Sequence, residues 1–136
     1  MNLFRIQLDL FKGFTWLWVL FLMYHYQNYS TGMYLYLFLH GTYGICWVIK
    51  DIWFPDARYL TKASVCSQIG LFILLTSYWT IPLPLAAGLG IDHPSQSRII
   101  FLVVMYITGV ILMMGADYQK TTTLRKKKGI FFSIQA

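Results

Sequence analysis

The stretch IIFLVVMYITGVILMMGA, residues 99–116, contains no charged side chain and only two hydroxyl groups. As a helix it would extend about 27 Å, close to the ~30 Å hydrocarbon core of a bilayer. A segment of this length and composition is typical of a transmembrane helix. It decides how the rest of the chain is interpreted, because three further apolar stretches precede it: Gly13–Tyr26, Thr31–Ile49 and Ser64–Ile91.

The composition excludes an ordinary soluble domain. The 136 residues are 57% apolar, 18% aromatic and 12% charged, whereas about 25% of the residues in soluble domains are charged. The net charge of +6 is dispersed among the segments that flank the apolar stretches, so no basic stripe for nucleic acid is present. We therefore predict an all-α fold, a polytopic membrane helical bundle with about four transmembrane helices.

The basic residues give this bundle an orientation. Ten of the eleven Lys and Arg residues fall on one side of the four stretches, and only Arg98 falls on the other. An excess of Lys and Arg in short loops marks the cytoplasmic face. We predict an integral membrane protein with both termini in the cytoplasm, in the endoplasmic reticulum if the cell is eukaryotic. The ten residues are Arg5, Lys12, Lys50, Arg58, Lys62, Lys120, Arg125, Lys126, Lys127 and Lys128.

The chain divides into three parts. Residues 1–12 predict an amphipathic helix along the headgroup boundary, with Arg5, Asp9 and Lys12 spaced along one face so that they can pair. Residues 13–116 form the predicted four-helix transmembrane domain. Residues 117–136 form a basic cytoplasmic tail.

The third apolar stretch is too long for one straight span. Its 28 residues would reach about 42 Å as a helix. Pro82 and Pro84 each lack a backbone donor, so they predict a break in the helix. The part after the break, 81–90, either lines a cavity or leads the chain out of the membrane.

The sequence has no metalloprotease, hydrolase or phosphate-loop motif, so the catalytic residues stay unknown and no metal site is predicted. A histidine in the middle of a membrane span needs a partner, and His40 occupies such a position. It either lines a substrate cavity or forms a structural hydrogen bond between helices, which is the commoner role. We take His40 and Tyr43 as the candidate residues of a substrate cavity. Gly41 and Gly44 predict close helix packing.

Asp117, Gln119 and Lys120 are a second candidate group. Their acidic, amide and basic side chains follow the fourth apolar stretch within one turn of a helix. A phosphorylated nucleotide requires such mixed hydrogen-bonding and cationic groups. The basic flank of a membrane helix has the same composition, so the pattern alone does not separate the two.

Two blocks resemble a known family. The segment LHGTYGICWVIKDIWFPD, residues 39–56, resembles the early portion of the steroid 5-alpha-reductase-like membrane proteins. The segment GADYQK, residues 115–120, resembles a later portion, together with Leu124-Arg125 and KKG at residues 127–129. Members of this polytopic family reduce lipid or sterol double bonds with NADPH, and a related branch methylates isoprenylated cysteines. The resemblance implies that Asp117, Gln119 and Lys120 border a pocket for NADPH.

In the family, the basic stretch leads into an Arg-Asn-Pro-x-Tyr-like motif and further membrane segments, whereas this sequence continues with IFFSIQA, residues 130–136. The chain therefore resembles the amino-terminal part of such an oxidoreductase, truncated or diverged at its end and incomplete for catalysis alone. If it is an enzyme, the resemblance implies an NADPH-dependent reductase that acts on a carbon–carbon double bond of a lipid.

The alternative is a small noncatalytic membrane subunit or scaffold of a larger assembly. Such a protein would pack through Gly41, Gly44 and its aromatic faces against partner helices. The expected partners are membrane lipids, a lipid or sterol substrate and partner helices, but no nucleic acid.

Overall fold

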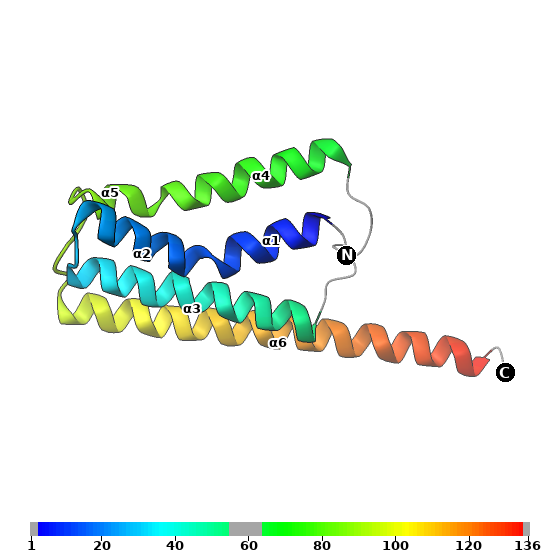
Figure 1. Ribbon diagram of the computed structural model, residues 1–136. Helices are drawn as coiled ribbons and strands as arrows, with labels where there is room; N and C mark the ends of the chain where they lie inside the picture. The colour runs from blue at the N-terminus through cyan, green and yellow to red at the C-terminus, as the bar shows by residue number, and fades with distance from the viewer. Residues whose placement is uncertain (1–2, 55–63, 135–136) are drawn as a thin grey trace.

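The computed structural model describes residues 3–54 and 64–134, which form six α-helices and no strand (Figure 1). The prediction of an all-α helical bundle is therefore confirmed for this part of the chain. Arg58 and Lys62, two of the residues in the predicted charge asymmetry, lie outside the described residues. The helices are α1 (Leu3–Gly13), α2 (Thr15–Tyr26), α3 (Thr31–Trp53), α4 (Val65–Thr80), α5 (Pro82–Ala86) and α6 (Gln96–Ile134).

Three helical segments of the described chain are long and apolar enough to cross a membrane. They are α3, the α4–α5 segment Val65–Ala86, and Gln96–Leu124 of α6. Helices α1 and α2 meet at a bend of 42° and make a fourth passage if the two are counted as one broken span. Residues 3–54 and 64–134 thus contain three such segments, or four with the bent pair.

All these segments run along one common direction, which gives the bundle two ends (Figure 1). At one end α1 begins, α3 ends and α6 leaves the bundle, and we call this the basic end because Arg5 and Lys50 lie there. At the opposite end α2 leads into α3, and α5 is followed by the turn that leads into α6. The buried apolar core lies near the opposite end and comprises Val19, Leu22, Met23, Met33 and Ala86.

The α1–α2 pair packs closely on α3 because α3 carries glycine at the contact. A methyl group added at Gly44 would lie 2.0 Å from the carbonyl oxygen of Lys12, and one added at Gly41 would lie 2.8 Å from Cβ of Trp16. The close helix packing predicted from these glycines is therefore present within this chain. The space beside both glycines is filled by α1 and α2 of the same chain, so a partner helix would have to contact other surfaces.

Helix α1 lies inside the bundle, against α3 and α4. Its placement along a headgroup boundary stays a prediction. Arg5 and Asp9 form the predicted ion pair, with 3.9 Å between Nε and Oδ2. Lys12 does not join them, and no ion pair within the described residues involves it.

The predicted break at the prolines is confirmed. Helix α4 ends at Thr80 and α5 begins at Pro82, whose missing donor falls at the first position of a helix, where no partner is needed. Asn28 fixes the following segment to the α2–α3 connection. Its side-chain amide donates to the carbonyl oxygen of Leu85 at 3.0 Å and to a carboxylate oxygen of Asp92 at 3.3 Å.

Helix α6 is the longest element, with 39 residues. It packs against α3 and then extends well beyond the bundle at the basic end (Figure 1). The predicted tail is thus a direct helical continuation of the apolar segment as far as residue 134. Gln119, Lys120, Leu124 and the basic residues 125–128 favour helix, and residues 117–134 contain no proline to interrupt it.

Candidate functional site

The two residues predicted for a substrate cavity, His40 and Tyr43, lie in one cavity of about 400 Å³. Four elements contribute to its wall. Helix α3 supplies Leu39, His40 and Tyr43, while α1 supplies Lys12, α4 supplies Tyr78, and α6 supplies Leu102 and Tyr106.

A second cavity, of about 330 Å³, continues from the first toward the opposite end. The two share Leu39, His40 and Leu102, so they adjoin each other along α3. The second part is lined mainly by apolar side chains, together with Tyr36, His40 and Arg98. We call the combined space the α3–α6 groove. From Gly32 to Tyr43 it extends about 17 Å along α3. Its second part is lined by Gly32, Leu35, Tyr36, Leu39, His40, Leu85, Ile91, Pro94, Arg98 and Leu102.

His40 stands at the junction of the two parts. Its ring stacks on Tyr36, with 3.9 Å between centroids and 7° between planes, and lies 6.0 Å from the ring of Tyr78. Its Nδ1 is buried and forms no well-made hydrogen bond within the described residues. A hydrogen bond from this nitrogen to another helix is therefore not found among the described residues, and His40 lines both cavities.

Tyr106 and Thr42 join α6 to α3 beside the groove. Their hydroxyl oxygens lie 2.7 Å apart, and Phe38 packs against the Tyr106 ring with 6.4 Å between centroids. This contact places Tyr106 in the groove wall. The sequence analysis did not single out Tyr106, although a tyrosine in the middle of an otherwise apolar span is a signal that could have found it.

Lys12 is the second residue that the sequence analysis did not place in this site. Its ammonium nitrogen lies 4.1 Å from the ring centroid of Tyr78, 5.2 Å from that of Tyr43 and 5.7 Å from that of Trp47. Tyr43 and Trp47 are four residues apart, so they share a face of α3. The aromatic faces attract the ammonium electrostatically.

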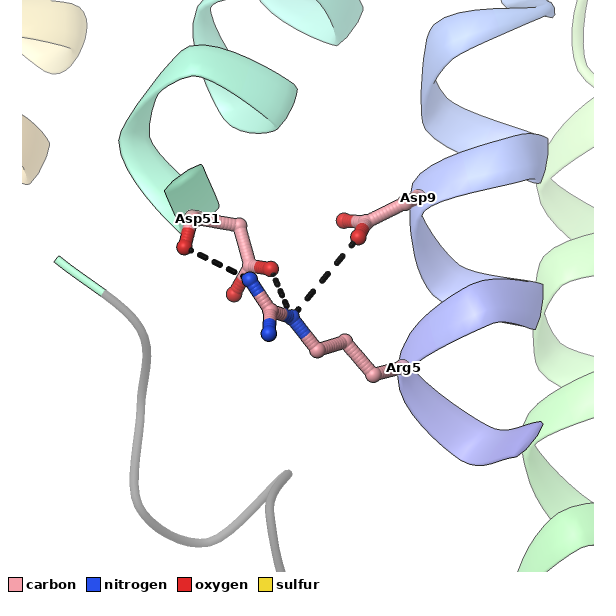
Figure 2. A network of polar contacts seen from close by, with 3 residues as sticks. All are labelled: Arg5, Asp9 and Asp51. Carbon is pink, nitrogen blue, oxygen red and sulfur yellow. Dashed lines mark hydrogen bonds and ion pairs between the residues drawn. The ribbon is translucent and has the colours of Figure 1, made fainter. Parts of the chain in front are cut away.

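A separate ionic cluster lies at the basic end (Figure 2). The Arg5 guanidinium donates to the Asp51 carboxylate through Nε and to the Asp51 carbonyl oxygen at 3.0 Å through Nη2. Asp9 approaches the same guanidinium from the next turn of α1 (Figure 2). Asp51 is 1% exposed. Because a buried carboxylate needs a partner, this cluster ties α1 to the end of α3.

Asp117 belongs to a second ion pair at the basic end. Its Oδ2 lies 3.1 Å from Nζ of Lys50, whose side chain is 4% exposed and also lies 4.3 Å from the ring centroid of Trp47. Phe54, four residues after Lys50, and Tyr118, one residue after Asp117, form an edge-on ring contact with centroids 5.8 Å apart. These contacts bring α6 against the end of α3.

The candidate cofactor residues do not converge on the groove. The carboxylate of Asp117 forms an ion pair with Lys50, and the side chains of Gln119 and Lys120 are exposed. None of the three lines the α3–α6 groove. Along α6, Asp117 is about 17 Å beyond Tyr106. A role of these three residues in binding NADPH stays a prediction.

Comparison with protein-family models, curated proteins and solved structures found no match to this chain.

Proposed function

We propose that this chain is an integral membrane protein that binds a lipid or sterol-like molecule in the α3–α6 groove. We further propose that it is related to the amino-terminal part of the steroid 5-alpha-reductase-like oxidoreductases, with both termini in the cytoplasm. The observation that carries the proposal is the groove itself. It is an elongated apolar space along a membrane-crossing helix, with His40 and tyrosines at one end.

Ligand sites are typically concave and mostly apolar, with a few polar groups that fix the orientation of the ligand. The groove has this character, since leucine and isoleucine line one part and His40, Tyr43 and Tyr78 line the other. An oily molecule would reach it from the bilayer without crossing water. The polar part would then orient whichever functional group the molecule carries.

The contact between the two resembling blocks supports the proposed relationship. The blocks are about sixty residues apart in sequence, yet Lys50 of the first pairs with Asp117 of the second, and Phe54 of the first contacts Tyr118 of the second. Segments that work together in one site have to lie side by side. A chance similarity in two unrelated segments would not require this contact.

Photolabelling would test the binding function. The full chain, purified and placed in lipid nanodiscs, is exposed to a photoreactive sterol and to a photoreactive fatty acyl ester. We expect saturable labelling of peptides that contain His40 or Leu102. Leu102→Trp should fill the shared part of the groove and abolish most of the labelling. Leu112→Trp is the matched control, because Leu112 lies on the same helix, is 66% exposed and lines neither part.

Labelling that is not saturable, or that is equal in Leu102→Trp and Leu112→Trp, would reject the groove as a binding site. A second measurement addresses the oxidoreductase part of the proposal. Titration of the same preparation with NADPH, and a search for its oxidation in the presence of sterol and enoyl lipids, shows whether this chain binds and uses the cofactor on its own.

The alternative of a noncatalytic membrane subunit is favoured by one specific observation. The apolar part of α6 has no buried residue, so the helix offers a long surface to lipid or to another membrane helix. Two results together would favour this function instead. A partner protein would copurify in stoichiometric amount and be lost when the surface of α6 is substituted, and the ligand labelling would not be saturable.

A further inference from the structure

Building on the proposed lipid-binding function, we infer that the groove selects a single-chain lipid with a carboxylate head group, and that the Lys12 ammonium pairs with that carboxylate. Lys12 lies at the end of α1 but between the two ends of the bundle, and it has no acidic partner within the described residues.

Lys12 lies deep along the bundle. Its carbonyl oxygen is the atom that approaches Gly44 most closely, and Gly44 is about 14 Å from the basic end of α3 and about 20 Å from its other end. If α3 crosses a membrane, Lys12 is near the middle of the ~30 Å core. An ionisable group at that depth is costly and typically marks a functional site.

The described carboxylates do not neutralise Lys12, because each has another partner. Asp9 and Asp51 face Arg5, and Asp117 pairs with Lys50. Asp92 accepts from Ser30 at 3.1 Å, at the opposite end of the bundle. The rings around Lys12 attract its charge but cannot accept all three ammonium donors. A charge left in an apolar cavity favours an anionic ligand over a neutral one.

The groove determines where the rest of the ligand lies. With the head at Lys12, the rest of the ligand would extend past His40 and Leu102 into the adjoining apolar part, toward Arg98. Because the groove extends about 17 Å along α3, it suits a single extended alkyl chain. One ammonium balances the single charge of a carboxylate, whereas a phosphate monoester carries about −1.5 to −2. Charge balance therefore favours the carboxylate.

Paired probes would test this selectivity. Photoreactive palmitic acid, its methyl ester and a photoreactive lysophosphatidic acid are each titrated against the full chain in nanodiscs. We expect the wild-type protein to bind the acid at least about tenfold more tightly than the ester, which corresponds to about 1.4 kcal/mol. Lys12→Met should abolish this preference while the ester still binds. Lys12→Arg should retain it, and Arg98→Gln, at the other end of the groove, should not abolish it. Lys126→Met, at an exposed position outside the groove, is the neutral control.

Several outcomes would overturn the inference while the binding function stands. The first is that Leu102→Trp blocks binding of the ester but the wild-type protein shows no preference for the acid. The second is that the preference for the acid persists in Lys12→Met or is lost in Arg98→Gln instead. The third is that the wild-type protein binds the phosphate more tightly than the acid. If Lys12→Met loses both ligands, Lys12→Arg decides. Retained preference for the acid supports the inference, and equal binding of acid and ester refutes it. No blockable binding of any probe would reject the proposed function itself.

Discussion

Gly44 is important for packing because it has no side chain. It allows the backbone of α1 to touch that of α3, and the nearest atom is the Lys12 carbonyl oxygen, which cannot move without moving the helix. A glycine in the same fold without such a contact is Gly70, where an added methyl group would meet nothing within 4 Å. The two positions therefore separate the packing role of glycine from its effect on helix propensity.

We predict that Gly44→Ala destabilises the protein by about 1–3 kcal/mol, because an added carbon in a filled contact forces the backbone to shift. Gly70→Ala should be neutral or stabilising by up to about 1 kcal/mol, as expected for an exposed helical position. Unfolding in detergent by denaturant titration, followed by tryptophan fluorescence, measures both. Equal effects of the two substitutions would show that α1 does not pack on Gly44.

Single residues were predicted from sequence only where the pattern lies within one helix. The spacing of Gly41 and Gly44 indicates close packing, and the structure confirms it. The spacing of Arg5 and Asp9 indicates an ion pair, which is also present. Lys12 was placed wrongly in that group, because its contacts come from α3 and α4 and no local pattern shows which helices will surround a side chain.

At the scale of elements, the Lys50–Asp117 pair is the polar contact between α3 and α6 near the basic end. Lys50 is the more buried partner, with 4% of its side chain exposed against 22% for Asp117. Loss of Asp117 would leave a buried ammonium without its counter-ion. Loss of Lys50 would leave a carboxylate that water can still reach.

We therefore predict that Asp117→Asn lowers the free energy of unfolding by about 3 kcal/mol, near the lower end of the range for broken buried ion pairs. Lys50→Met should cost clearly less, and the double variant should resemble Lys50→Met. Lys126→Met, an exposed position further along α6, should stay within about 0.5 kcal/mol of the wild type. The prediction fails if Asp117→Asn is no worse than this control.

Element boundaries followed from sequence to different degrees. The proline break after Thr80 was predictable because proline lacks a donor and restricts its neighbours. The length of α6 was not predicted, since hydropathy shows where an apolar segment ends but does not show where a helix ends. The candidate site was half predicted. His40 and Tyr43 come from one helix and were found, whereas Tyr78 and Tyr106 reach the groove only through the tertiary arrangement.

At the scale of the whole molecule, the charge pattern predicts which end of the bundle faces the cytoplasm. The helices place the start of α4 at the basic end and the turn before α6 at the opposite end (Figure 1). If the basic end faces the cytoplasm, as the Lys and Arg distribution indicates, these two places lie on different sides of the membrane. Cys66 is exposed near the first, and His93 is exposed in the second.

A membrane-impermeant thiol reagent should distinguish the two sides. In sealed vesicles with Cys46→Ala, we expect Cys66 to react only when the cytoplasmic face is outward. A thiol introduced by His93→Cys, in a background of Cys46→Ala and Cys66→Ala, should react only in vesicles of the opposite orientation. That background without the new thiol controls for nonspecific labelling. If both thiols react from the same face, the arrangement of the helices across the membrane is contradicted. If each thiol reacts from the face opposite to the one expected, only the orientation inferred from charge is contradicted.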